Sequence, residues 1–217
     1  QAFETCGMVE FAKSFNLLGR LAGDPVYADR IEDVMLNHFP ASHTPDLKAL
    51  HYLTASNQPQ LDSSENHDYR NKRRQVDYSP HLYRCCQHNA AMGWPWYVQH
   101  LWQATSDNGL AAWTYAASEV SAVVGDGTEL TLVADTEYPF QTTVDITVRA
   151  PRPCEFPLYF RVPRWCDGFS VAVNGRTGGA QAQAGSFVRI RREWSDGDDI
   201  HIEMPVRLTS TQIGRAS

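Results

Sequence analysis

The sequence predicts an α+β chain, with helices in residues 1–104 and an antiparallel β-sandwich in residues 105–217. Three observations support this prediction. Apolar residues recur at steps of three and four in the first part and at steps of two in the second, and no helical pattern separates the later strands. The change of period places the domain boundary near residue 105.

Two amphipathic helices are expected at the start of the chain. The first covers residues 6–22 and carries one apolar stripe. The positions of that stripe are Met8, Phe11, Phe15, Leu18 and Leu21. Gly23-Asp24-Pro25 ends this helix, and a second helix runs from about Val26 to Pro40, with Tyr27, Ile31, Val34, Met35 and Phe39 on one face. The short linker predicts an antiparallel helical hairpin.

The middle of the chain is less regular. Lys48–Leu53 can form a short strand, and residues 58–84 form a polar, turn-rich loop of a length that is usually functional or mobile. A third helix is expected from Gln87 to Ala104, with Pro95 as a kink or a point of restart.

Seven strand-like segments follow Asp107-Asn108-Gly109. Asn174-Gly175 is typical of a type I′ hairpin turn. Short strands at regular spacing with turn signals between them predict a sandwich. The expected strands are Leu110–Val124, Glu129–Ala134, Thr142–Arg149, Pro157–Val162, Phe169–Val173, Ser186–Arg191 and Asp199–Met204.

Composition excludes several classes of protein. The 217 residues include 42% hydrophobic and 20% charged residues, which is enough apolar material for a core and argues against disorder. The formal net charge of −6 argues against a nucleic-acid partner. No apolar run is long enough to span a membrane, so no membrane partner is expected either.

Three of the five cysteines stand near expected helix starts. Cys6, Cys85 and Cys86, together with Glu4, lie where helix N-termini favour anions, and three thiols with one carboxylate can form a tetrahedral zinc set. The alternative is that these cysteines are small buried hydrophobic residues. An atypical carboxylate ligand and a surplus thiolate favour catalysis, because a metal-ionised cysteine can attack an electrophilic carbon. Cys154 and Cys166 are either free or paired.

The order of these motifs resembles glycoside hydrolase family 127, the zinc-dependent β-L-arabinofuranosidases and their relatives. The helical half carries the resemblance in Glu4-Thr5-Cys6, Gly23-Asp24-Pro25, His51-Tyr52-Leu53 and Cys85-Cys86-Gln87-His88-Asn89. The strand half adds Tyr138-Pro139-Phe140, Arg161-Val162-Pro163-Arg164-Trp165, Val173-Asn174-Gly175 and Trp194-Ser195-Asp196-Gly197-Asp198. The resemblance implies that residues 1–104 are the last helices of an (α/α)6 toroid and that residues 105–217 are the β-sandwich after it. We therefore expect a C-terminal portion of a longer protein.

The resemblance also implies a site. Zinc is held by Glu4, Cys6, Cys85 and Cys86, and Cys85 is the nucleophile that forms a thioglycosyl enzyme with retention of configuration. Tyr52, with His51 beside it, matches a substrate contact. The substrate would be a small glycoside or oligosaccharide with a terminal furanoside. The family's acid/base glutamate lies upstream of the E-T-C motif, so no residue of this chain is expected to take that role.

Two other interpretations stay open at this stage. The zinc can be purely structural, with the sandwich serving as a carbohydrate-binding or packing module, or Cys85-Cys86 can be a redox pair without metal. A catalytic site leaves Cys85 reachable, whereas a structural site is closed. Clustered reduced thiols favour a reducing compartment such as the cytoplasm.

Overall fold

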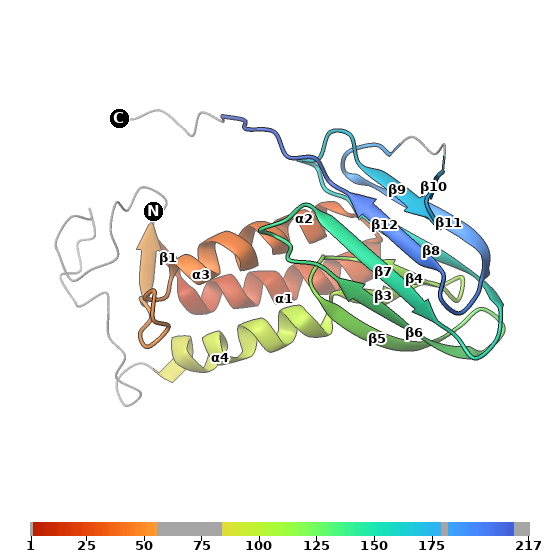
Figure 1. The fold of residues 1–217 in the computed structure, drawn as a ribbon. Coiled ribbons are helices and arrows are strands. Elements are labelled where there is room, and N and C mark those ends of the chain that lie inside the picture. Colours follow the sequence, from red (N-terminus) through yellow and green to blue (C-terminus); the bar gives the residue numbers. More distant parts are fainter. Residues whose placement is uncertain (1, 56–83, 179–181, 211–217) are drawn as a thin grey trace. The chain divides into compact units, whose positions relative to one another are not determined.

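The computed structural model describes residues 2–55, 84–178 and 182–210, and the chain divides into two compact units, residues 1–103 and residues 104–217 (Figure 1). The expected loop at residues 58–83 lies outside the described residues. None of the described helices is long and apolar enough to cross a membrane.

Unit 1 (residues 1–103) is mainly helical. The two strands of a short antiparallel pair stand before and after its first four helical segments. Gly23 ends the first helix as expected, since its left-handed φ of 66° lets its N–H reach the Gly19 carbonyl oxygen at 2.7 Å. The elements are β1 (Ala2–Glu4), α1 (Thr5–Ala22), α2 (Val26–Asp33), the π-helical turn η1 (Val34–His38), α3 (Phe39–Ala41), β2 (Leu53–Ala55) and α4 (Arg84–Gln99).

Several expected boundaries in unit 1 are wrong. Helical structure continues past Pro40 to Ala41, because Pro40 stands in the first turn of α3, where a missing N–H is tolerated. Lys48–Leu53 is not a strand: Leu50 makes only an isolated bridge to His43, and β2 begins at Leu53. The third helix begins and ends earlier than predicted and contains Pro95.

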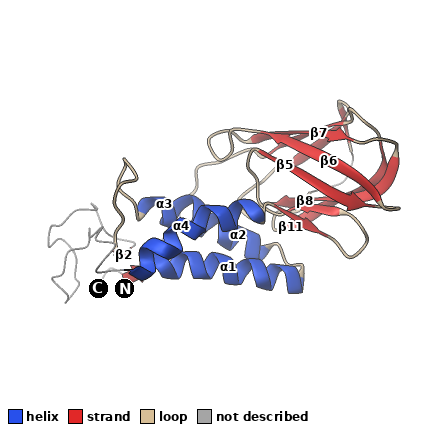
Figure 2. Cartoon of the chain, turned by 90° about the horizontal axis from the view of Figure 1, so that it is seen from below, coloured by secondary structure: helices blue, strands red, loops and turns tan. Residues whose placement is uncertain are grey.

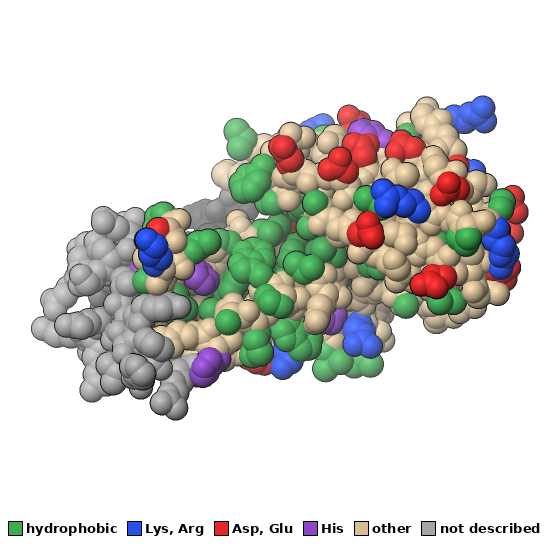
Figure 3. All heavy atoms as spheres, turned by 60° about the horizontal axis from the view of Figure 1, so that its bottom comes forward, with side chains coloured by type: hydrophobic (Ala, Val, Ile, Leu, Met, Phe, Trp, Pro, Cys, Tyr) green, Lys and Arg blue, Asp and Glu red, His purple; other side chains and the backbone are tan. Residues whose placement is uncertain are grey.

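The buried face of α1 differs in part from the predicted apolar stripe: Met8 is buried and Phe15 is half-buried, but the other three members are exposed. Phe11, Leu18 and Leu21 are 57%, 42% and 78% exposed. Small or polar side chains dominate the buried face, and they let α1 lie close to α2 and α4. The buried residues are Thr5, Met8, Val9, Ala12, Asn16 and Gly19. Figure 3 shows hydrophobic side chains gathered over the helices. By contrast, the predicted face of the second helix is confirmed at Ile31, Met35 and Phe39, which are all buried.

Unit 2 (residues 104–217) consists of strands, and Figure 2 shows them in two layers. One sheet has the order β10-β9-β12-β7-β6-β5 and the other β11-β8-β4-β3. The strands are β3 (Trp102–Ala104), β4 (Leu110–Ala112), β5 (Ser118–Val124), β6 (Thr128–Asp135), β7 (Thr143–Arg149), β8 (Cys154–Val162), β9 (Ser170–Val173), β10 (Arg176–Thr177), β11 (Ser186–Trp194) and β12 (Asp199–Glu203).

Two features of the strands differ from the prediction. The expected strand Leu110–Val124 is two strands, β4 and β5, which belong to different sheets. All strand pairs with a described register are antiparallel except β4 with β8, which is parallel. The predicted turn between β9 and β10 is confirmed, since Asn174 and Gly175 have φ values of 50° and 72°.

The core of unit 2 follows from alternation along the strands. In β6, β7 and β12, every second side chain is buried, including Leu132, Ile146 and Ile200 with no exposed surface. Cys154 and Cys166 are buried and free, so they form no disulfide. This unit therefore encloses its own apolar residues through the ordinary period of a strand.

Candidate metal and thiol site

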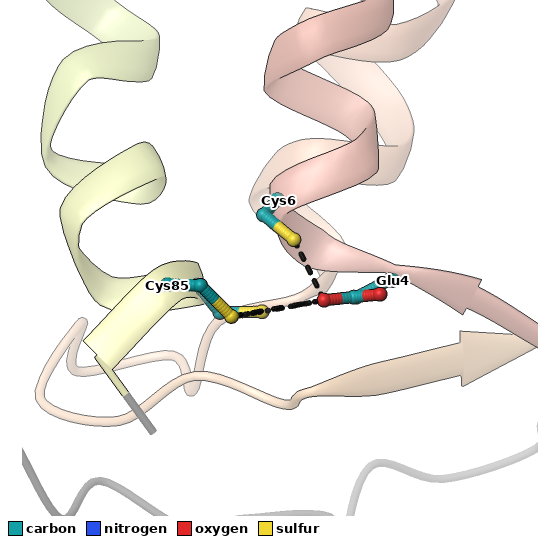
Figure 4. Close-up of side chains that lie close together, drawn as sticks. Glu4, Cys6 and Cys85 are labelled. Carbon is teal, nitrogen blue, oxygen red and sulfur yellow. Dashed lines mark hydrogen bonds between the residues drawn. The ribbon is translucent and has the colours of Figure 1, made fainter.

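Four side chains of unit 1 converge on one group of potential metal ligands. One ligand atom from each residue lies within 4.8 Å of all the others. The residues are Glu4, Cys6, Cys85 and Cys86, the same four that the sequence predicts. Figure 4 shows Cys6 and Cys85 directed at the carboxylate of Glu4 from two different helices. We call this group the thiol–carboxylate cluster.

The N-terminal half of the cluster depends on where β1 ends. Glu4 is the last residue of β1 and has an extended backbone with φ of −85° and ψ of 135°. Its side chain makes no capping hydrogen bond to α1, although carboxylates commonly cap helices in this way. Instead, the Cys6 Sγ donates a hydrogen bond to Glu4 Oε1 at 2.7 Å. The Glu4 carboxylate is therefore available to sulfur atoms.

The other half comes from the first turn of α4. The Sγ atoms of Cys85 and Cys86 lie 3.8 and 3.7 Å from Glu4 Oε1 and 4.0 Å from each other. Cys86 is fully buried, whereas Cys85 is exposed. The side-chain amide of Asn89 donates to the Cys85 carbonyl oxygen at 3.0 Å. The adjacent cysteines thus differ in access: one is packed into the unit and the other can be reached.

The segment before β2 brings Tyr52 to the cluster. β1 and β2 pair antiparallel with Glu4 opposite Leu53, and the Thr5 N–H donates to the Tyr52 carbonyl oxygen at 3.1 Å. The Tyr52 hydroxyl oxygen lies 4.0 Å from the Cys85 Sγ. Its neighbour His51 is fully buried. Of the two predicted substrate contacts, only Tyr52 presents surface at the cluster.

The charges of the cluster are set by hydrogen bonds and burial. The hydrogen bond from Cys6 lowers the pKa of Glu4 against the opposing effect of burial, and bonds from Tyr52 and the two other thiols lower it further. Burial raises the pKa of Cys86 to about 11. Burial, and then Glu4, raise the pKa of Cys6. Glu4 is also the largest cause of the raised pKa of Tyr52. The metal-free cluster therefore favours an ionised Glu4 beside the protonated thiols of Cys6 and Cys86.

The spacing of the ligand atoms fits a tetrahedral ion. Zinc–sulfur bonds of about 2.3 Å and zinc–oxygen bonds of about 2.0–2.2 Å put tetrahedral ligands roughly 3.5–3.8 Å apart. The sulfur–sulfur and sulfur–oxygen distances at Cys85 and Cys86 are 3.7 to 4.0 Å. The 2.7 Å contact between the Cys6 Sγ and the Glu4 Oε1 is shorter than this ligand spacing. Thiolates with a carboxylate are a donor set that suits zinc.

Two residues around the cluster were not singled out from the sequence. Thr5 has no exposed surface, and its hydroxyl donates to the His51 carbonyl oxygen. Asn89 binds the Cys85 backbone. A threonine at the first position of a helix does not by itself indicate a functional role. The role of Thr5 can be inferred only once the segment before β2, which accepts its hydrogen bond, is placed beside it. His88, which stands near the cysteine pair in sequence, is exposed and is not part of the described cluster.

Unit 1 also contains an apolar cavity of about 220 Å³. Its lining combines β1, α1 and the η1 turn and contains no member of the thiol–carboxylate cluster. The lining residues are Phe3, Met8, Phe11, Phe15, Val34 and His38.

Sequence models of two domains match the chain. The catalytic-domain model of the GH127 β-L-arabinofuranosidases matches residues 1–99, and the GH127 middle-domain model matches residues 109–206. A search of curated proteins finds no match.

Three solved structures share the fold, and two of them are described as GH127 enzymes. A GH127 β-L-arabinofuranosidase from Geobacillus stearothermophilus T6 superposes with a TM-score of 0.74 at 25% identity, over 93% of this chain and 31% of that one. A protein described as a glycoside hydrolase gives a TM-score of 0.76 at 23% identity, over 93% and 32%. A GH127 β-arabinofuranosidase gives 0.73 at 20% identity, over the same shares. The chain spans about a third of the length of these proteins.

The fold and the cluster define a class: helices that bear a possible metal site, followed by largely antiparallel sheets. Within that class the two matched domain models identify the family. The chain belongs to glycoside hydrolase family 127, and its two units correspond to parts of the catalytic and middle domains.

Proposed function

We propose that this chain is part of a retaining glycosidase that uses a zinc-bound cysteine nucleophile and acts on a terminal furanoside such as a β-L-arabinofuranoside. One observation carries the proposal: Cys85 is an exposed thiol inside a cluster of four ligands whose other cysteine on α4 is fully buried. A closed structural site would bury all its sulfur ligands alike.

The fold is part of the proposal. Residues 1–104 would be the last helices of an (α/α)6 toroid, and residues 105–217 a β-sandwich. The exposed apolar stripe of α1 and the apolar cavity beside it support the toroid, because large apolar surfaces of this kind usually meet other protein.

Glu4, Cys6, Cys85 and Cys86 would hold the zinc ion. When bound, zinc supplies positive charge that keeps the thiols ionised at neutral pH. The chain's own contribution is geometry. The end of β1 presents the Glu4 carboxylate, and the first turn of α4 presents two sulfur atoms at 3.7 and 3.8 Å from it.

Cys85 would act at the anomeric carbon. Its thiolate forms a carbon–sulfur bond while the glycosidic carbon–oxygen bond breaks, and the leaving oxygen takes a proton from an acid group. Water then forms a new carbon–oxygen bond and gives its proton to the same group, and the sulfur leaves as thiolate. Two displacements at one carbon retain its configuration. We assign no residue of this chain to the acid/base role.

Tyr52 would contact the sugar, since its hydroxyl lies 4.0 Å from the Cys85 Sγ. His51 was predicted with it, but its side chain is buried. We therefore propose a supporting role for His51 and leave direct contact to Tyr52.

The test is to replace Cys85→Ser in the full-length protein and to measure turnover of an aryl β-L-arabinofuranoside together with zinc content. We expect turnover to be lost while the protein stays folded. Cys166→Ser is the matched control, because Cys166 is a buried thiol of unit 2 outside the cluster. Full activity in the Cys85 variant would rule out the nucleophile. A zinc-loaded wild-type protein whose Cys85 resists iodoacetamide would instead support a structural zinc site.

A further inference from the structure

Thr5 links the two chain segments that meet at the cluster. It is the first residue of α1, lies between Glu4 and Cys6, and has no exposed surface. Its backbone N–H donates to the Tyr52 carbonyl oxygen at 3.1 Å, and its hydroxyl donates to the His51 carbonyl oxygen. One residue of the ligand segment therefore binds two consecutive peptide groups of the segment that carries Tyr52.

The backbone hydrogen bonds on either side of Tyr52 come from other residues. The antiparallel pairing of β1 with β2 reaches Leu53, opposite Glu4, and does not include Tyr52. On the preceding side, the His51 N–H donates to the Ser42 carbonyl oxygen at 2.7 Å. The two hydrogen bonds from Thr5 lie between these backbone contacts. They are accepted by the carbonyl oxygens of His51 and Tyr52.

The side chain held in this way faces the reactive thiol. The Tyr52 hydroxyl lies 4.0 Å from the Cys85 Sγ and hydrogen-bonds to Glu4. A rotation of the His51–Tyr52 peptide would move that hydroxyl away from both groups. A hydroxyl on Thr5 opposes the rotation, and a methyl group there would not.

We propose that Thr5 is a positioning residue, whose hydroxyl fixes the His51–Tyr52 backbone so that the Tyr52 hydroxyl stays beside the Cys85 thiol. The inference rests on the proposed function for its catalytic consequence. The structural part of the inference does not depend on turnover: Thr5 and Tyr52 are coupled, and their coupling changes the reactivity of the Cys85 thiol.

The experiment is a double-mutant cycle of Thr5→Val and Tyr52→Phe in the full-length protein. The first readout is the rate at which iodoacetamide alkylates Cys85, followed by mass spectrometry with and without added zinc. We expect each single variant to raise the metal-free rate about fivefold, the effect of one ordinary hydrogen bond. We expect the double variant to match Tyr52→Phe alone. The second readout is turnover, where kcat should fall in Thr5→Val while zinc content stays unchanged.

The matched control is Thr54→Val. The Thr54 hydroxyl also bonds across the β1–β2 pair, to the Phe3 carbonyl oxygen at 3.5 Å, but it does not belong to the cluster. We expect this variant to behave as wild type. Because Val can fail to fold at a buried position, the pair Thr5→Ser and Thr5→Ala repeats the comparison without adding atoms, and only the Ala variant should change the rate.

Additive effects of Thr5→Val and Tyr52→Phe, or an unchanged alkylation rate in both Thr5→Val and Thr5→Ala, would overturn the inference. Coupling at Cys85 in a protein that shows no glycosidase activity would uphold the inference and reject the proposed function. The two failures are therefore distinguishable.

Discussion

The two units bury their apolar side chains in different ways. Unit 2 alternates along its strands and leaves residues such as Leu132, Ile146 and Ile200 with no exposed surface. Unit 1 buries small and polar residues of α1 and leaves Leu21 78% exposed. Unit 2 encloses its apolar residues within one core. In unit 1, by contrast, α1 packs closely against its neighbours and leaves several large apolar side chains exposed.

The difference suits what each unit carries. Cys6 and Cys86 come from separate helices and must approach closely, which small buried residues such as Ala12 and Gly19 of α1 and Gly93 of α4 allow. A helix pair with large side chains between its axes would hold the two segments farther apart. The site thus favours a narrow interface between α1 and α4, and the larger side chains Phe11, Leu18 and Leu21 of α1 stay exposed.

The largest expected effect tests the contrast between the two cores. Leu132→Ala in β6 should lower the free energy of unfolding by about 2–5 kcal/mol, because it leaves a cavity in a closed core. Leu21→Ala in α1 is the same chemical change at an exposed site and should cost no more than about 0.5 kcal/mol. Denaturant unfolding of the 217-residue chain measures both. A larger loss for Leu21→Ala would show that the stripe is already covered in this chain.

The next effect tests the narrow interface of unit 1. A Cβ atom on Gly93 would lie 2.6 and 2.9 Å from two ring atoms of Phe39 and 3.2 Å from Val9. Gly93→Ala should therefore cost about 1–3 kcal/mol despite its better helix propensity, and it should weaken zinc binding by displacing α4.

Gly7→Ala is the control, since a Cβ at this helical glycine meets nothing within 4 Å. It should stabilise the chain by up to about 1 kcal/mol. Thermal unfolding and competition with a zinc chelator measure the two variants. Equal zinc affinity in Gly93→Ala and wild type would mean that the spacing of α1 and α4 does not set the site.

The sequence predicted which residues form the thiol–carboxylate cluster better than it predicted the buried face of α1. Glu4, Cys6 and the cysteine pair carry their chemistry in their residue types and their positions at helix starts. The face of α1 was misjudged because periodicity reveals a stripe but not the surface that meets it. In this chain Met8 of the stripe is buried, but so are Ala12 and Asn16 outside it, while Phe11, Leu18 and Leu21 are exposed.

The strands show the same division. Alternation correctly predicted β6 and β7, where one face is buried and the other is not. It did not separate β4 from β5, because all three residues of β4 are buried and give no alternating signal. Likewise, the parallel pairing of β4 with β8 depends on a contact between distant segments, and so does the hydrogen bond from Thr5 to His51.

A smaller effect concerns pH and metal together. Burial raises the pKa of Cys86 to about 11 from an ordinary value of 9.0, and Cys6 is raised as well. Below about pH 9 these two thiols do not lower the free energy of unfolding of the metal-free protein. That free energy should fall as pH rises from about 9 toward about 11, because the thiols ionise first in the unfolded chain. Bound zinc requires ionised thiols and should remove this loss.

Melting temperatures of the chelator-treated chain at about pH 7.5 and about pH 10, with and without added zinc, test this prediction. Cys166 of unit 2 also has a pKa raised by burial to about 11, so the comparison is made in Cys166→Ala, which lacks the contribution of this thiol. If zinc gave no protection at the higher pH in that variant, the cluster would not bind the metal through its buried thiols.

The smallest effect belongs to the surface of unit 2. The His201 Nδ1 lies 2.6 Å from the Asp145 Oδ1 across β12 and β7, and this carboxylate raises the pKa of His201. Both side chains are about half exposed, so the pair should contribute under about 1 kcal/mol. Its contribution is complete below the ordinary histidine value of 6.5 and disappears as pH rises through the raised one. Asp145→Asn should therefore lower the melting temperature at about pH 5.5 and hardly at about pH 8.5. An equal loss at both values would mean that the pair acts as a neutral hydrogen bond, and that charge adds nothing to a unit whose stability comes from its alternating core.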